Sequence, residues 1–364
     1  MIVSEVTDIL EELAPLSYAE DFDNVGLLLG EPTTKVTGIL VTLDTLESVV
    51  DEAIATNCNL IISFHPIIFK GLKKITGATY VERVVIKAIQ HGICIYCMHT
   101  ALDNMHQGVN NKICEVLGIM NPKILLPKNG SIKKLVTYVP TKEADSLKKA
   151  LFEAGGGALG NYSHCSFSLE GTGSFKAEKN ARPTVGKKGE IHYEKETQIH
   201  ITFPSDVQKH VIKALFEHHP YEEVAYEIYS LENTHQQIGM GMIGELATPM
   251  AEKDVLKLIK DRMNASGIRH SSLLGKKIQR VAVLGGSGSF AISAAKAKGA
   301  DLFITADIKY HQFYEAENCI VIADIGHYES EQYTKNLLVD YLTKKIPNFA
   351  IALSKSITNP IKYY

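Results

Sequence analysis

The feature that most constrains this chain is a regular alternation of apolar and amphipathic stretches in its first and last thirds. The apolar stretches are GILVTLD (38–44), LIISFHP (60–66), ICIYCMHT (93–100), RVAVLGG (280–286), LFITADI (302–308) and CIVIADIG (319–326). Strands that are buried on both faces are continuously apolar, and the stretches between these six have a helical period. The alternation therefore predicts an α/β fold with parallel sheets covered by helices.

The first and last thirds also resemble each other. Residues 38–63 can be set over residues 280–305 without a gap, so that strand, helix and strand coincide in turn. The identical pairs are then Val41/Val283, Ala53/Ala295, Ala55/Ala297, Leu60/Leu302 and Ile62/Ile304. Any two strand–helix–strand units share apolar periodicity, so the matching lengths matter more than these identities. We infer two related halves that form one discontinuous α/β domain.

The middle of the chain, from about Lys134 to Glu232, follows a different order. Its pattern is strand and helix, then antiparallel strands, then helix and strand, which is typical of a ferredoxin-like α+β domain. A turn-rich stretch, NARPTVGKKGE, lies within it and is predicted to form a hairpin. Because the α/β rhythm resumes afterwards, we interpret 131–235 as a domain inserted into an α/β domain that comprises 1–130 and 236–364.

Composition excludes several functional classes. The net charge of −3 argues against tight nucleic-acid binding, and no apolar run approaches the ~20 residues that span a bilayer. The N-terminus is acidic and amphipathic, which is wrong for a signal peptide. Cys94 and Cys97 have the spacing of a zinc knuckle, but they lie in an apolar stretch without a second such pair. Small buried cysteines in a reducing compartment fit better, so we expect a cytoplasmic protein.

Polar residues follow several of the predicted strands. His65 comes directly before Pro66, which holds it in an extended conformation at the strand end, although an ordinary loop histidine has the same appearance. Asp103 follows the strand at 93–100 and suits either a helix N-cap or a hard metal ligand. In parallel sheets, ligands gather at the carboxyl ends of strands, which places both residues at one edge.

A third strand end carries His327 and Glu331, four residues apart at the start of a predicted helix. This spacing puts both side chains on one helical face, where they can hold one ion together. The alternative is a first helical turn enriched in acidic residues, whose negative charges interact favourably with the positive end of the helix dipole. Two imidazoles and two carboxylates at one sheet edge suit zinc, manganese or iron, whereas magnesium and calcium prefer oxygen alone.

The segment GGSGS (285–289) lies between a strand and a helix. The amides of Gly286, Ser287 and Gly288 are predicted to cradle an anion there, although a plain tight turn explains the same sequence. Asp307 and His311 follow the next strand, beside the presumed cleft. We assign these two residues to proton transfer.

Six motifs in order carry a resemblance to a known family: DNVGLLLG (23–30), SFHPIIF (63–69), HTALD (99–103), GGSGSF (285–290), FITADIKYH (303–311) and GHYESE (326–331). Over essentially all 364 residues the chain resembles the GTP cyclohydrolase 1 type 2 homologues, also called Nif-three-like dinuclear-metal proteins. The inserted segment, with GGGALGNYSHCSF, GTGSFK and HHPYEEVAYEIY, resembles the PII/CutA-like domain of longer bacterial members.

The resemblance implies a paired-metal site in each subunit and a ring-shaped homohexamer. One metal would be held by His65, Asp103 and Glu331, and the second by His327 with Glu331 bridging. The family pattern usually begins the first motif with two histidines, but this chain has Phe64, which cannot ligate a metal. The second position would then be weaker, empty, or completed by water or His99.

These observations predict a hydrolase that uses one or two divalent cations per subunit. Such cations activate water and polarise a carbonyl or phosphate substrate. The family name implies ring opening of GTP, so the expected substrate is a nucleotide or another phosphate-containing small molecule. The alternative is a ring-forming metal-binding regulatory or scaffold protein that senses a small metabolite through the inserted domain.

Overall fold

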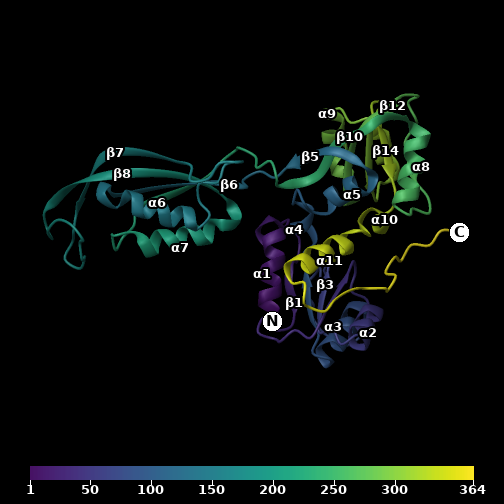
Figure 1. The fold of residues 1–364 in the computed structure, drawn as a ribbon, viewed down its shortest axis with the longest axis horizontal. Helices are drawn as coiled ribbons and strands as arrows, with labels where there is room; N and C mark the ends of the chain where they lie inside the picture. The colour runs from purple at the N-terminus through teal and green to yellow at the C-terminus, as the bar shows by residue number, and fades with distance from the viewer. The chain divides into compact units, whose positions relative to one another are not determined.

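The computed structural model describes residues 1–364 and divides into two compact units (Figure 1). The first unit combines residues 1–127 with 236–364. The second consists of residues 128–235 and is called the inserted unit below. None of the helices is both long and apolar enough to cross a membrane.

The first sheet of the large unit has the strand order β1-β4-β3-β2-β15. Its strands are β1 (Gly26–Leu29), β2 (Ile39–Thr42), β3 (Leu60–Ser63), β4 (Cys94–Cys97) and β15 (Ile351–Leu353). The helices of this half are α1 (Val3–Leu13), α2 (Glu47–Ala55), α3 (Tyr80–Gln90), α4 (His99–Asp103) and α5 (Val109–Leu117). Four strands run parallel, and β1 pairs antiparallel to β4 at one edge. Every residue of β2, β3 and β4 is buried, which explains their continuous apolar sequence.

The second sheet has the order β11-β14-β13-β12-β10-β5, and its only parallel pairings are β12 with β13 and β13 with β14. Its strands are β5 (Ile119–Pro127), β10 (Gly239–Ala251), β11 (Arg269–His270), β12 (Lys277–Ser287), β13 (Leu302–Ala306) and β14 (Val321–Asp324). Its helices are α8 (Glu252–Arg262), α9 (Ile292–Ala297), α10 (His327–Glu331) and α11 (Thr334–Lys345). One hydrophobic core contains residues of both sheets.

The predicted relation between the halves appears in the strand register. Ile39 pairs with Leu60 between β2 and β3, and Val281 pairs with Leu302 between β12 and β13. In both pairs the partners are 21 positions apart along the chain. The α/β fold class is therefore confirmed, with antiparallel strands added at sheet edges.

Several elements differ from the sequence-based prediction. Residues 309–317 contain a 3-10 helix (Tyr310–Ala316), not an α-helix, and the closing helix is split into α10 and α11. The long strand β10 was missed because three glycines make it resemble a loop. At two of them, Gly239 and Gly244, a Cβ would collide with the backbone of β5, so close pairing requires glycine there.

The inserted unit forms a four-stranded antiparallel sheet in the order β7-β8-β6-β9. Its elements are β6 (Ile132–Pro140), α6 (Ala144–Glu153), β7 (Ser166–Lys176), β8 (Ile191–Pro204), α7 (Gln208–His218) and β9 (Tyr226–Ser230). This is the strand–helix–strand–strand–helix–strand connectivity of ferredoxin-like domains. In the stretch where antiparallel strands were predicted, Ser166–Lys176 form one continuous strand, β7. Both helices pack on one face of the sheet around a separate core.

Candidate metal centre

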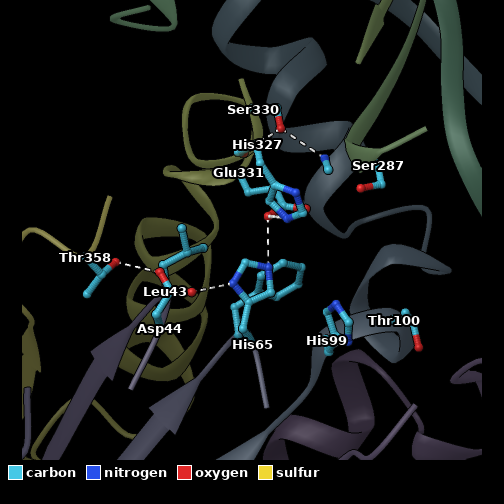
Figure 2. A network of polar contacts seen from close by, with 12 residues as sticks. Leu43, Asp44, His65, His99, Thr100, Ser287, His327, Ser330, Glu331 and Thr358 are labelled. Carbon is cyan, nitrogen blue, oxygen red and sulfur yellow. Dashed lines mark hydrogen bonds and ion pairs between the residues drawn. The ribbon is translucent and has the colours of Figure 1, made fainter. Parts of the chain in front are cut away.

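The four predicted ligands come from three strand ends of the large unit. His65 follows β3, Asp103 is the last residue of α4 just after β4, and His327 and Glu331 lie on α10 just after β14. Figure 2 shows His65, His327 and Glu331 turned toward one another. The carboxyl ends of parallel strands thus bring together side chains that are up to 266 positions apart in the sequence.

Glu331 lies at the centre of this group. Its Oε2 atom is 3.0 Å from Nε2 of His65 and 3.2 Å from Nε2 of His327. The Glu331 side chain is only 3% exposed, so these imidazoles meet it in a nearly dry environment. Ligand atoms of the three residues all lie within 4.8 Å of one another, which is close enough for one cation to contact them together.

Three buried polar atoms at this point have no hydrogen-bond partner: Nε2 of His65, Oε2 of Glu331 and Oδ1 of Asp103. The 3.0 Å contact between His65 and Glu331 is an ion-pair distance without the angles of a hydrogen bond. Buried polar atoms are costly unless they are satisfied, and a cation held by His65, His327 and Glu331 would satisfy the first two of these atoms. The nitrogen and carboxylate donors fit zinc, manganese or iron.

Asp103 does not cap a helix, because it ends α4 and the next helix is preceded by Gly108. Burial, followed by the negative charge of Glu331, raises the pKa of the Asp103 carboxyl well above its usual value. The imidazolium charges of His65 and His327 act in the opposite direction. Asp103 therefore belongs electrostatically to the same site, although it lies outside the closest group of three ligand atoms.

Each ligand imidazole is oriented by a carboxylate on its far side. Nδ1 of His65 lies 2.8 Å from Oδ1 of Asp44, and Nδ1 of His327 lies 2.6 Å from Oδ2 of Asp307. Because carboxylates only accept hydrogen bonds, both Nδ1 atoms donate and both Nε2 atoms face Glu331. Thr358 supports this arrangement by donating to Oδ2 of Asp44 at 2.6 Å (Figure 2).

Asp44 was not predicted as a site residue, although it lies two residues after the end of β2, at a strand end like the other site residues. Asp307 was assigned to proton transfer, and its observed contact is with His327. Its backbone has φ = +56°, a left-handed conformation that non-glycine residues rarely adopt. His311 is exposed, with its ring 5.1 Å from that of Tyr310. The catalytic roles of Asp307 and His311 stay predictions.

The GGSGS segment shapes the site from the side of β12. The backbone N–H of Gly286 donates to Oγ of Ser330 at 2.9 Å, and the hydroxyl of Ser287 donates to Asp307. Gly286 has φ = +66°, and a Cβ there would collide with the carboxylate of Glu331. This glycine therefore makes room for a predicted ligand. The anion-binding role of Gly286, Ser287 and Gly288 stays a prediction, with one of the three amides already used internally.

Phe64 and His99 form the remaining wall. Phe64 is fully buried, and its ring centroid lies 4.9 Å from that of His65 and 5.6 Å from that of His99. The His99 ring is 5.3 Å from the His65 ring, and its Nδ1 lies 2.8 Å from Oδ1 of Asp23. His99 is thus held by a carboxylate in the same manner as both ligand histidines.

Comparison with known proteins decides the family. The model of the Duf34/NIF3 (NGG1p interacting factor 3) family matches residues 1–360. The chain belongs to the DUF34/NIF3 family. The Bacillus subtilis relative named GTP cyclohydrolase 1 type 2 homolog is 36% identical over 369 residues, which cover 99% of this chain and 98% of the relative. The predicted family is therefore confirmed.

Two solved structures of DUF34/NIF3 relatives have the same fold over the whole chain. The Bacillus cereus protein related to NIF3 matches with a TM-score of 0.83 and 36% identity, covering 100% of this chain and 99% of that one. The Staphylococcus aureus protein SA1388 matches with a TM-score of 0.79 and 30% identity, with the same coverage.

The contact between Asp44 and His65 leads to a first prediction for this DUF34/NIF3 protein. We expect Asp44→Asn to weaken binding of a divalent cation by about 10–100-fold, because the amide no longer fixes the imidazole tautomer as a carboxylate does. Competition with a chromogenic chelator measures this affinity. Asp51→Asn, an exposed change on α2, is the control and should leave the affinity unchanged. Equal weakening in both variants would contradict the assigned role of Asp44.

Proposed function

We propose that this DUF34/NIF3 protein is a divalent-metal-dependent hydrolase that acts on a nucleotide or another phosphate-containing small molecule. The observation that carries the proposal is the convergence of ligand atoms from His65, His327 and Glu331 within 4.8 Å of one another. Two of these atoms, Nε2 of His65 and Oε2 of Glu331, are buried without a hydrogen-bond partner. A polar cluster of this kind is costly to bury without a cation. Zinc, manganese or iron, one or two ions per subunit, suit the donor set.

A divalent cation in this position supplies Lewis acidity toward a carbonyl or phosphoryl oxygen. The protein's own residues prepare the site for it. Asp44 and Asp307 hold both imidazoles so that their Nε2 atoms face the centre. The hydrogen bond from His327 holds the pKa of Asp307 below its usual value, so this half-exposed carboxylate stays ionised and keeps accepting the Nδ1–H of His327.

A cavity of about 430 Å³ beside His65 offers room for the substrate. Its lining includes Thr45, Leu46, Pro66, Ile67 and Tyr80, so apolar walls alternate with hydroxyl groups. Its volume lies within the range of small-molecule sites. Asp44 and His65 line the cavity, whereas Glu331 and His327 do not, so a bound molecule would approach the metal centre from the side of Asp44.

The test is turnover of GTP and a panel of phosphate esters by protein loaded with zinc, manganese or iron. We expect hydrolysis by the metal-loaded protein, loss of at least about 100-fold in His65→Ala, and wild-type rates in the exposed control His91→Ala. GTP belongs in the panel because the relatives carry the name GTP cyclohydrolase 1 type 2 homolog. Activity that persists in His65→Ala would contradict a metal mechanism at this site.

The resemblance to the family also supports a homohexameric ring, formed in the cytoplasm. The expected result is a particle six times the mass of the chain in light scattering of the purified protein. A monomer that keeps its bound metal would contradict the ring while leaving the metal centre intact.

The second candidate function is a ring-forming regulatory or scaffold protein that senses a small metabolite through the inserted unit. It is favoured by Phe64, which is fully buried where the family pattern places a histidine. Metal content of protein purified without an affinity tag separates the candidates. Two ions per subunit favour the hydrolase, and none favours the scaffold.

A further inference from the structure

The inserted unit contains a cavity of about 480 Å³ that the metal centre does not explain. It lies where the end of β7 and the following segment 177–184 meet the loop 221–225, next to β6 and β8. All of its lining residues belong to the inserted unit. The volume is in the range of sites that enclose a small organic molecule.

One carboxylate is fixed inside this cavity. Oε1 of Glu196 accepts a hydrogen bond from the Tyr221 hydroxyl at 2.9 Å. Gly173 lies against the same carboxylate, because a Cβ at this position would collide with it. Glu196 is half-buried and forms no ion pair with a lysine or arginine of the chain. The cavity thus holds a negative charge without a protein counter-ion.

Aromatic rings stand beside this carboxylate. Phe175 and Tyr221 both line the cavity, with ring centroids 6.2 Å apart, and Tyr138 contributes a third aromatic side chain. The remaining walls are mostly apolar. Aromatic faces attract cations, and this attraction strengthens where water is excluded. A carboxylate that shares a cavity with aromatic rings therefore selects a ligand with a cationic head and an apolar, planar body.

An anionic ligand fits less well. The two basic residues of the lining, Lys176 and Arg182, are both exposed, so their charges remain in water at the rim. Glu196, by contrast, is the half-buried charge, and it would repel an anion from inside the cavity. Charge and position therefore favour a cation.

We propose that the inserted unit binds a small aromatic amine in its protonated form in this cavity, with Glu196 as the counter-ion and Phe175 and Tyr221 as the aromatic walls. This goes beyond the proposed hydrolase and names a ligand class for the second candidate function. The residues of this cavity are not part of the metal centre. A failure of this proposal therefore does not bear on the hydrolase proposal.

The experiment uses three probes that share one indole ring and differ only in the head group: tryptamine, tryptophol and indole-3-propionate. Binding to the full chain is measured by isothermal titration calorimetry near pH 7. We expect saturable binding of tryptamine, binding of neutral tryptophol at least about tenfold weaker, and weaker binding still of the anion. Absence of saturable tryptamine binding up to about 10 mM, or tightest binding of the anion, overturns the proposal.

Matched variants locate the site. Glu196→Gln keeps the shape of the side chain and removes its charge, so tryptamine should bind about tenfold or more weakly while tryptophol binding changes little. Glu217→Gln alters an exposed residue on α7 outside the cavity and should change neither by more than about twofold. Gly173→Ala displaces the Glu196 carboxylate without altering any charge and should weaken tryptamine binding as well. Equal tryptamine affinities in wild type and a folded Glu196→Gln protein overturn the assignment.

Discussion

We expect Glu331→Gln protein to bind a divalent cation more than about 100-fold more weakly than the wild type, because loss of an outer-shell partner alone costs 10–100-fold. Glu331 contacts both imidazoles of the site: its Oε2 atom lies 3.0 Å from Nε2 of His65 and 3.2 Å from Nε2 of His327. Glutamine keeps its size but lacks the negative charge that a cation requires. The measurement is the dissociation constant from chelator competition.

The same substitution should also destabilise the metal-free protein. Glu331 faces two imidazoles whose protonated forms it stabilises, and its own pKa stays low, at about 2, because these charges outweigh the effect of burial. Breaking a fully buried ion pair costs ~3–5 kcal/mol, but here each imidazole keeps a second carboxylate and His327 is partly exposed. We therefore expect the free energy of unfolding in chelator to fall by only about 2 kcal/mol.

The control for both measurements is Glu329→Gln on the same short helix. Glu329 is buried as well, but its carboxylate accepts a hydrogen bond from Asn359 and contacts neither imidazole. Its replacement should leave metal affinity within about threefold of the wild type, since no ligand or outer-shell partner is lost. If Glu331→Gln and Glu329→Gln lose affinity equally, the effect belongs to the helix and not to a metal ligand.

The second large effect is a steep rise of metal affinity with pH. Burial alone lowers the pKa of both histidines, but Glu331 together with Asp44 raises that of His65 to about 10. Asp307 and Glu331 likewise raise that of His327 to about 11. Below these values each imidazole carries a proton on Nε2 that a metal must displace. Affinity therefore increases with pH, by about tenfold per pH unit for each proton released.

Two displaced protons predict a gain of about 10⁴-fold in affinity between about pH 6 and pH 8. Dissociation constants for manganese across this range measure the slope. Titration calorimetry in two buffers of different ionisation enthalpy counts the released protons directly. Asp307→Asn is the informative variant, because it removes one of the carboxylates that raise the pKa of His327 and should make the slope shallower. An affinity that does not change with pH would show that the imidazoles do not ligate the metal.

The parallel strands could be predicted from the sequence, because strands that are buried on both faces consist of uninterrupted runs of apolar residues. Residues of β2, β3 and β4 are all buried, and each was recognised as a strand. Edge elements were harder. The short strands β1 and β15 each pair on one side only. The strand β10 pairs on both sides, but its three glycines are atypical of a strand. Local sequence carries little information about pairing with a distant edge.

The same contrast holds for the site. His65, Asp103, His327 and Glu331 were predicted from strand ends and family motifs, since parallel topology places such residues at one edge. Asp44 and the contact of Asp23 with His99 were missed. An aspartate at a strand end or in a loop has many ordinary roles, and only its imidazole partner, 21 or 76 positions away, distinguishes it.

By itself, the sequence determined that the chain alternates strands and helices in two related halves. It also determined which four candidate metal ligands lie at strand ends. These properties follow from short-range periodicity and from the chemistry of single side chains. The tertiary structure alone decided that three of their polar atoms are buried without partners, that Gly286 yields space to Glu331, and that Thr358 supports Asp44 across 314 positions. Burial and satisfaction of a polar atom depend on every element packed around it, and no local pattern records that environment.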